Sequence, residues 1–500
     1  MPSDPKTSAI RAALTVAAAV ALSLGHSPSA RAQASGSFSF NPNDIVVAVE
    51  GDGAGTGAYA DGQAAPLSLY QYATTGTSSA TQAGLLVLPQ TSITGGNYAV
   101  SGEYGSSSEA TLQLSGNGQY LTVMGYATNA NSYNSAYDVN GTGTALAQSP
   151  NVTGNAADVS RVIALIGANG SVNSTTAIGN VFNQNNPRSV YTANGTSFYI
   201  SGQGNKDTTG GVFYVANVGA TKATAITGAD TSSKSNGAYN QDTREVQIVN
   251  GQLVVSADSS EGTASKGLDI DRIGTLGAPG SPPTTTLNQQ PSALPGLNGA
   301  ITLSNGNGNS INGSSGSAYL SPENFFYANA TTLYVADTGL SKNGTQGTAT
   351  GNLGDGGLQK WSLNNGTWTL DYTLSAGLNL VANTSSDGVS GLYGLTGKVV
   401  GNSVELFATS YVLGDTDQTY LYGIADTLSD TSASQVTGED FTTLAAAPAD
   451  SEFKGVSLAP VPLPPGLPLL LSGLVVIGLV ARRSNGTRSA GAASARGLLA

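Results

Sequence analysis

Short apolar segments alternate with polar turns from about residue 41 to residue 460. One unit recurs along this stretch: an Asn-Gly or similar turn, an apolar segment, a long polar loop and a second apolar segment. Short apolar runs bounded by Gly, Asn and Ser predict β-strands. The first apolar segments of the units are residues 45–50, 120–124, 197–201, 252–256, 332–336 and 403–407.

These segments start about 72 residues apart on average, which indicates an internal repeat. Each unit has a second strand after its loop. One further strand before the first apolar segment and one after the second bring the count to four strands per unit. The second strands are predicted at residues 66–71, 161–165, 211–215, 267–271, 357–362 and 419–423. Six units of four antiparallel strands predict an all-β fold, a six-bladed β-propeller over residues 41–460. A seven-bladed ring and a β-helix are the alternatives.

The two ends of the repeat region are expected to meet. The first unit lacks a leading strand, and residues 453–458 form an unassigned apolar segment at the far end. If residues 453–458 pair beside residues 45–50, the ring closes and its open sheet edges disappear. We therefore predict this pairing.

Residues 1–32 are typical of a secretory signal peptide. Lys6 and Arg11 supply the positive charge that precedes an apolar run at residues 12–24. Ala30 and Ala32 form a small-x-small cleavage site after the run. We predict an exported protein whose mature chain starts at Gln33. Cleavage removes His26, the only histidine of the chain.

Composition then limits the chemistry that the mature chain can perform. With no Cys and no remaining His, Ser-His-Asp and Cys-His catalysis are excluded, as are His-ligated metals. A formal net charge of −12 argues against nucleic acid as a partner. The 66 glycines and the low charged fraction of 10% suit many short strands joined by turns.

The C-terminal region carries a second targeting signal. Val461, Pro462, Leu463 and Pro464 lead into an apolar run at residues 467–480, which Arg482 and Arg483 follow. We predict a single transmembrane helix near residues 466–482, with the arginines on the cytoplasmic side. A plain membrane anchor is one interpretation.

This order of Pro-rich motif, apolar helix and arginine cluster resembles the PEP-CTERM sorting segment of Gram-negative bacteria, here over residues 461–483, in a variant with Leu463 in place of the usual Glu. The resemblance implies an exosortase-type processing enzyme as a partner. It also implies a stage in the inner membrane and delivery to the cell surface or the extracellular matrix. Residues 484–500 are expected to be a disordered tail.

The long loops of the predicted blades are acidic. Carboxylates on flexible Gly-rich loops are ligands that Ca²⁺ prefers, although Asp also favours turns without any ligand. The candidate calcium ligands are Asp52, Asp61, Asp337, Asp355, Asp415 and Asp417.

Two functions follow from these patterns. The first is a non-enzymatic, surface-sorted propeller that binds a ligand, with surface polysaccharide as a candidate, or builds extracellular matrix. The second is a calcium-dependent hydrolase of the lactonase or phytase kind on the same ring. Three or more carboxylates that converge within reach of a metal ion at the mouth of the central channel would favour the hydrolase, whereas scattered, solvated carboxylates would favour the binding protein. The four arginines of the domain, Arg161, Arg188, Arg244 and Arg272, are few for a sialidase.

Overall fold

The structure is a computed structural model, and it describes most of the region between residues 38 and 462. The described ranges are residues 38–54, 59–137, 144–151, 158–205, 208–227, 242–258, 272–298, 300–303, 316–339, 356–382 and 385–462. Within them the chain forms β-strands and a single eight-residue helix, α1 (Ala130–Tyr137). The prediction of an all-β fold is confirmed for these residues.

Four sheets contain four antiparallel strands each, in the orders β12-β11-β10-β9, β13-β14-β15-β16, β19-β20-β21-β22 and β23-β24-β25-β26. Their strands are β9 (Pro187–Tyr191), β10 (Phe198–Gly202), β11 (Gly211–Val215), β12 (Thr224–Ala225), β13 (Thr243–Val249), β14 (Gln252–Ala257), β15 (Arg272–Leu276), β16 (Ser292–Asn298), β19 (Pro322–Asn329), β20 (Thr332–Asp337), β21 (Gly357–Asn364), β22 (Thr367–Leu374), β23 (Val389–Val400), β24 (Ser403–Val412), β25 (Tyr420–Thr427) and β26 (Thr442–Ala446).

A fifth sheet has nine strands in the order β27-β1-β2-β4-β6-β7-β8, with β3 paired to β2 and β5 paired to β6. These strands are β1 (Ile45–Gly51), β2 (Ala64–Thr75), β3 (Ser79–Val87), β4 (Ser101–Glu103), β5 (Gln113–Leu114), β6 (Tyr120–Tyr126), β7 (Arg161–Gly167), β8 (Val172–Ile178) and β27 (Ser451–Leu458). A separate hairpin pairs β17 (Ala300–Leu303) with β18 (Gly316–Tyr319).

The prediction of six separate four-stranded blades is wrong, because only four such sheets occur among the described residues. The physical reason lies in the short strand β4. Its Ser101 pairs with Pro66 of β2 on one side and with Tyr126 of β6 on the other. The first and second sequence units therefore share one continuous sheet. The predicted strand at residues 267–271 lies outside the described residues, and β14 pairs instead with β15.

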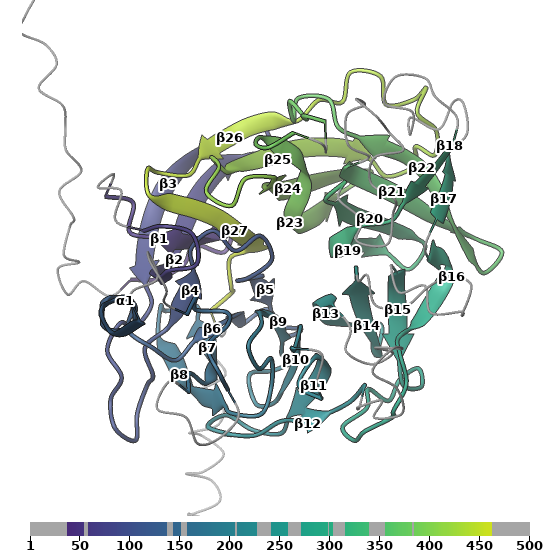
Figure 1. Ribbon diagram of the computed structural model, residues 1–500. Helices are drawn as coiled ribbons and strands as arrows, with labels where there is room; N and C mark the ends of the chain where they lie inside the picture. Colours follow the sequence, from purple (N-terminus) through teal and green to yellow (C-terminus); the bar gives the residue numbers. More distant parts are fainter. Residues whose placement is uncertain are drawn as a thin grey trace, which may run out of the picture. The chain divides into compact units, whose positions relative to one another are not determined.

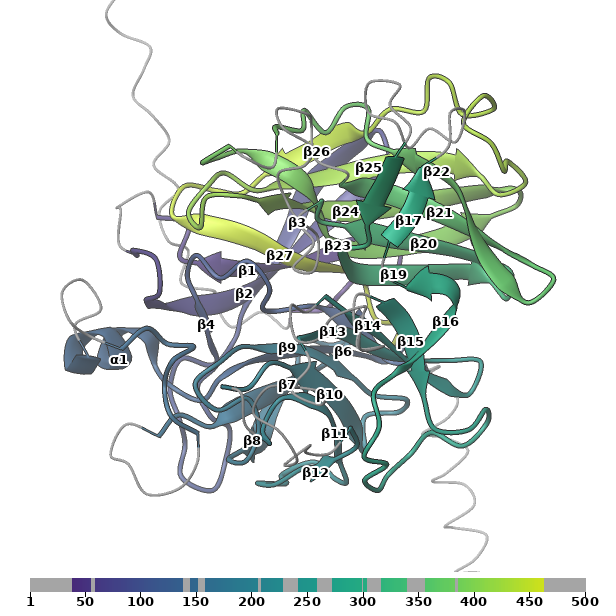
Figure 2. The ribbon, with the colours of Figure 1, turned by 45° about the vertical axis from the view of Figure 1, so that its right-hand side comes forward.

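The predicted pairing of the two ends is confirmed. Strand β27 lies antiparallel to β1, with Ile45 opposite Leu458 and Val49 opposite Phe453. The innermost strands then contact one another in a closed circuit: β27 contacts β5, β5 contacts β9, β9 contacts β13, β13 contacts β19, β19 contacts β23, and β23 contacts β27. Figure 1 shows these strands facing a common centre, and Figure 2 shows the sheets from a second direction. This propeller-like circuit is called the ring below.

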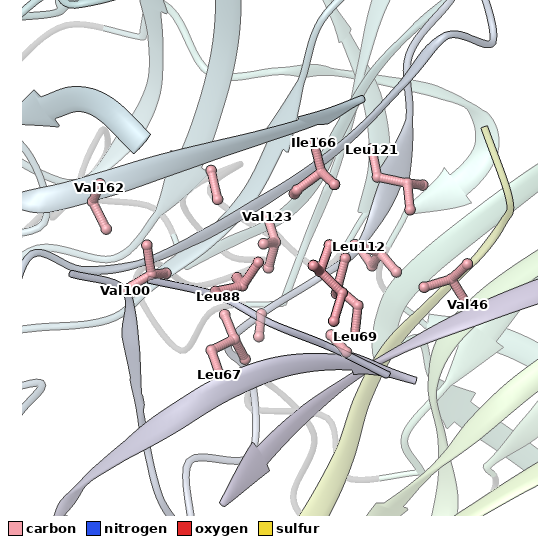
Figure 3. Close-up of a cluster of buried hydrophobic side chains, with 14 of the residues drawn as sticks. Val46, Leu67, Leu69, Leu88, Val100, Leu112, Leu121, Val123, Val162 and Ile166 are labelled. Carbon is pink, nitrogen blue, oxygen red and sulfur yellow. The ribbon is translucent and has the colours of Figure 1, made fainter. Parts of the chain in front are cut away.

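Neighbouring sheets pack their faces against each other, so several strands have apolar residues on both faces. All seven residues of β1 are buried. Val46 and Ala48 belong to one apolar cluster, whereas Ile45, Val47 and Val49 belong to another. In the first cluster, drawn in Figure 3, residues of β1 and β2 pack with residues of β6 and β7. This two-sided burial is what a strand between two neighbouring sheets requires.

The predicted end segments lie mostly outside the described residues. The signal cleavage residues Ala30 and Ala32 are not described, and neither are Leu463, Pro464, Arg482 and Arg483. The predicted membrane helix near 466–482 falls in the same undescribed part. Among the described helices, none has the length and apolar character needed to cross a membrane.

Candidate functional site

Five of the six candidate calcium ligands are described, and three of them are engaged in local structure. Asp337 is fully buried and accepts hydrogen bonds from the backbone N–H groups of Ser321 and Gly339, at 2.8 Å each, and from Gln359 Nε2 at 3.0 Å. Asp417 accepts from two glycine N–H groups. Asp52 caps its own turn by accepting from Ala54 N at 2.8 Å. Asp355 lies outside the described residues.

The remaining two aspartates, Asp61 and Asp415, lie close together. A methyl group added at Gly105 would lie 2.6 Å from Asp61 Oδ1 and 3.2 Å from the Asp415 backbone oxygen. Partial burial, together with the Asp61 carboxylate, raises the pKa of Asp415. Nevertheless, no set of three or more acidic, His or Cys side chains in the described part of the chain is arranged to hold a metal ion. The candidate aspartates of the described residues thus form no ready-made set of three carboxylates for a calcium ion.

A different set of carboxylates gathers on the inner strands. Four buried glutamates and one buried lysine form what we call the acidic cluster. They are Glu50 of β1, Glu103 of β4, Glu109 of the segment before β5, and Glu452 and Lys454 of β27. Lys454 Nζ lies 2.5 Å from Glu452 Oε2 and 3.5 Å from Glu50 Oε2. Neither carboxylate oxygen of Glu50 accepts a hydrogen bond within the described part of the chain.

Hydrogen bonding differs sharply within the acidic cluster. Glu109 accepts from Asn186 Nδ2 at 2.6 Å, from the backbone N–H of Glu103 at 3.2 Å and from the Tyr126 hydroxyl. Glu50 has no such hydrogen bonds within the described part of the chain, and the Lys454 ammonium group, 3.5 Å from its Oε2, is its ion-pair partner there. Burial raises the pKa of Glu50 and of Glu103 well above the usual value, and the neighbouring carboxylates raise both further, whereas Lys454 lowers that of Glu50. Burial therefore favours the protonated form of these carboxyl groups, whereas the Lys454 ammonium group opposes this and favours the charged form of Glu50 and Glu452.

A second group of buried charged side chains, which we call the arginine cluster, lies on the inner strands β9, β13 and β19 and beside them. It contains Arg188 of β9, Arg244 of β13, Asp242, Asp258 and Glu323 of β19, all buried. Arg188 pairs with Asp242, and Arg244 pairs with Glu323. Arg244 also lies 3.2 Å from Asp242 and 4.0 Å from Asp258. Two of the four arginines thus come together, but each is paired with protein carboxylates.

Other polar contacts across the centre are also between neighbouring sheets. The Tyr393 hydroxyl of β23 donates to the Glu109 carbonyl oxygen at 2.6 Å. Gln113 of β5 donates to Ser189 of β9 at 2.5 Å and to the Val246 carbonyl of β13 at 3.0 Å. The described inner polar groups therefore act mainly to tie one sheet to the next.

The acidic cluster was not predicted from the sequence, although two features of the strands point to it. Glu50 is the sixth residue of a seven-residue strand whose other residues are apolar or glycine, a pattern that favours burial of the whole strand. Glu452 and Lys454 alternate along β27 and hence share one face, which is the spacing of an ion pair in a strand. The clustering itself also depends on contacts between residues far apart in the chain, such as Glu50 and Lys454, which no local pattern encodes.

Comparison with known proteins gives little additional information. No protein-family model and no curated protein sequence matches the chain. Among solved structures, the chain is similar to a prolyl endopeptidase, at 11% identity and a TM-score of 0.22 over 69% of this chain and 38% of that one. It is also similar to an ancestral GH74 enzyme, at 10% identity and a TM-score of 0.22 over 77% of this chain and 42% of that one. The chain thus spans about two fifths of the length of both enzymes, and at this TM-score neither likeness bears on its activity.

Proposed function

We propose that the protein is an exported, surface-sorted β-propeller that acts as a binding or matrix protein and is processed by an exosortase-type enzyme. The observation that carries this proposal is the position of the Pro-rich motif. The closing strand β27 ends at Leu458, and the motif begins three residues later, at Val461. Val461 is half exposed, and Pro462 is exposed.

The start of the motif is held against the ring surface. The Val461 N–H donates to the Gly118 carbonyl at 2.7 Å. Val461 and Pro462 line a cavity of about 300 Å³ together with Tyr120 and Asn169. The ring therefore closes before the motif begins, and cleavage beyond Pro462 would leave every strand pairing of β27 intact. This arrangement supports a folded domain that is released or attached by processing of its tail.

The inner charged clusters support a binding or structural role over catalysis. Glu109, Arg188 and Arg244 are each engaged by protein groups from neighbouring elements. A catalytic acid or base must instead be within reach of a substrate proton. On this basis we assign the clusters to ring cohesion.

The proposal is tested by fractionation of two truncated chains. Deleting residues 463–500 should change a retained or surface-sorted protein into one that is free in the periplasm or medium. Deleting only residues 484–500 keeps the Pro-rich motif, the apolar run and both arginines, so it should leave fractionation unchanged. Thermal unfolding of both chains would establish that the ring is intact. If the 463–500 deletion fractionates like the full chain, the sorting proposal is wrong.

The alternative, a calcium-dependent hydrolase, finds support in the proximity of Asp61 and Asp415. Its test is the effect of added calcium on thermal unfolding and on hydrolysis of lactone and phytate substrates. The hydrolase proposal expects calcium to raise the melting temperature and the hydrolysis rate, with both effects lost in Asp61→Asn and Asp415→Asn. The binding proposal expects neither effect.

A further inference from the structure

A solvent-accessible groove lies at the end of the β23–β26 sheet where β23 and β25 begin. Its volume is about 420 Å³, which is within the range of small-molecule sites. The apolar part of the lining is Leu378, Val381, Val389, Tyr420 and Tyr422, and the polar part is Asn379, Asp387, Asp417, Gln418 and Thr443. None of the residues that line the groove belongs to the acidic cluster or to the arginine cluster.

Two tyrosines provide the aromatic surface of the groove. Tyr420 and Tyr422 are two positions apart on β25, so their side chains share one face of the strand. Their ring centroids are 6.0 Å apart, with the planes inclined by 36°. Tyr422 is buried and packs edge-on against Phe441, which fixes it, whereas Tyr420 is only partly buried. A ligand can therefore contact Tyr420 without displacing core residues.

The polar lining favours a ligand with many hydroxyl groups and no negative charge. Asn379, Asp387, Gln418 and Thr443 are exposed and offer carboxylate, amide and hydroxyl groups. Asp417 uses Oδ2 to accept from the N–H groups of Gly388 and Gly414, and its Oδ1 accepts no hydrogen bond within the described part of the chain. None of the described lining residues is Lys or Arg, so two carboxylates would repel an anionic ligand.

We propose that this groove binds neutral saccharide units of a polysaccharide, with Tyr420 as the stacking surface for the C–H face of a sugar ring. Aromatic rings pack against apolar surfaces while amide and carboxylate groups orient hydroxyls by hydrogen bonds, and a sugar ring presents both kinds of surface. The inference rests on the binding role proposed above and names its ligand class and site.

The test measures binding of the full exported protein to immobilised neutral polysaccharides, dextran and galactomannan, and to acidic polygalacturonate. Two variants alter the groove. Tyr420→Ala removes the stacking surface, and Thr443→Tyr fills the groove from an exposed strand position where Tyr is well tolerated. The matched control is Tyr98→Ala, because Tyr98 is an exposed tyrosine outside the groove. Melting temperatures would show that each variant is folded.

We expect binding to at least one neutral polysaccharide, weakened about tenfold by Tyr420→Ala and by Thr443→Tyr, and unchanged by Tyr98→Ala. Neutral binding that is equal in all variants would overturn the groove while leaving a binding role in place. Binding to polygalacturonate alone would overturn the charge argument. Absence of any polysaccharide binding by the unaltered protein would overturn the ligand class, whereas the sorting proposal is decided separately by fractionation.

Discussion

Glu50 and Glu452 lie directly opposite each other in the register of β1 and β27, the strand pair that closes the ring. Both side chains are buried. Like charges at directly opposite positions destabilise an antiparallel pair, and burial adds a desolvation cost. Lys454, two residues from Glu452 on the same face of β27, lies within 4 Å of a carboxylate oxygen of each. The closing strand thus carries the ammonium group that offsets its own carboxylate and that of its partner.

Substitution of this lysine should be costly. Lys454→Met keeps much of the side-chain volume but leaves two buried carboxyl groups without their cation. Breaking a buried ion pair typically costs about 3–5 kcal/mol, so we expect the free energy of unfolding to fall by about that amount. Urea denaturation at pH 7 measures the change.

The matched control is Lys398→Met. Lys398 Nζ lies 2.9 Å from Glu405, but its side chain is 38% exposed. Exposed ion pairs contribute about 0–1 kcal/mol, so this variant should unfold almost like the unaltered protein. Equal losses in the two lysine variants would contradict a special role for Lys454.

Glu245 should make stability fall as the pH rises. Burial raises the pKa of Glu245 to about 8 from the usual 4.5, and the hydrogen bonds from Phe325 N–H and Gln247 only partly oppose this. A carboxyl group whose pKa is raised on folding stabilises the fold below its unfolded pKa, and this contribution is lost as the pH rises through the folded pKa. The affected window therefore runs from about pH 4.5 to about pH 8.

We expect Glu245→Gln to match the unaltered protein near pH 4.5 and to be more stable than it at pH 8, by about 4 kcal/mol. Thermal and urea unfolding at several pH values across this window measure the difference, with Asp52→Asn at an exposed turn as the control. Parallel stability profiles for Glu245→Gln and the unaltered protein would show that this carboxyl group is charged at little cost in the fold.

The strand positions could be predicted from sequence because the burial pattern is local. Apolar runs such as residues 45–50 and 332–336 appear as β1 and β20 with nearly the predicted bounds. The pairing of residues 453–458 with β1 could also be predicted, since a ring without it would leave two open edges. The blade count could not, because it depends on β4, a three-residue strand whose sequence, Ser-Gly-Glu, has no apolar run.

The functional residues could be predicted far less well than the strands. Asp337 and Asp417 have the residue type of a calcium ligand, yet their oxygens accept backbone hydrogen bonds in the fold. Residue type alone does not distinguish a ligand from a turn cap. The groove at Tyr420 could not be predicted from the sequence either, because its lining residues come from β23, β25, β26 and the loops before β23 and β25.

Truncation of Phe453 should test the closing strand itself. Phe453 is 1% exposed and packs edge-on against Tyr72 at 6.1 Å between ring centroids. Large-to-small changes of buried aromatic residues cost about 3–5 kcal/mol, so Phe453→Ala should lower the free energy of unfolding by that amount. Val461→Ala, at a half-exposed position just beyond the strand, should change it by less than about 0.5 kcal/mol. A small effect of Phe453→Ala would mean that β27 adds little to ring stability.

A close approach between Gly102 and Glu50 permits a test of the acidic cluster by a double-mutant cycle. A methyl group at Gly102 would lie 2.6 Å from Glu50 Cδ and 2.8 Å from Cγ, too close for ordinary contact. Gly102 does not have a positive φ, so an alanine there meets no backbone strain. Any cost of Gly102→Ala should therefore come from the clash with a fully buried side chain that has little room to move.

Removing the Glu50 side chain should relieve that cost. We expect Gly102→Ala to destabilise the ring by about 1–3 kcal/mol, as overpacking does, and Glu50→Ala to leave space for the new methyl group. The double variant should then be more stable than the sum of the two single changes implies, with a coupling energy of about 1–3 kcal/mol. Urea denaturation of all four proteins measures this energy. Additive effects would place the Glu50 side chain away from Gly102, and the Lys454 contact described above would then need a different geometry.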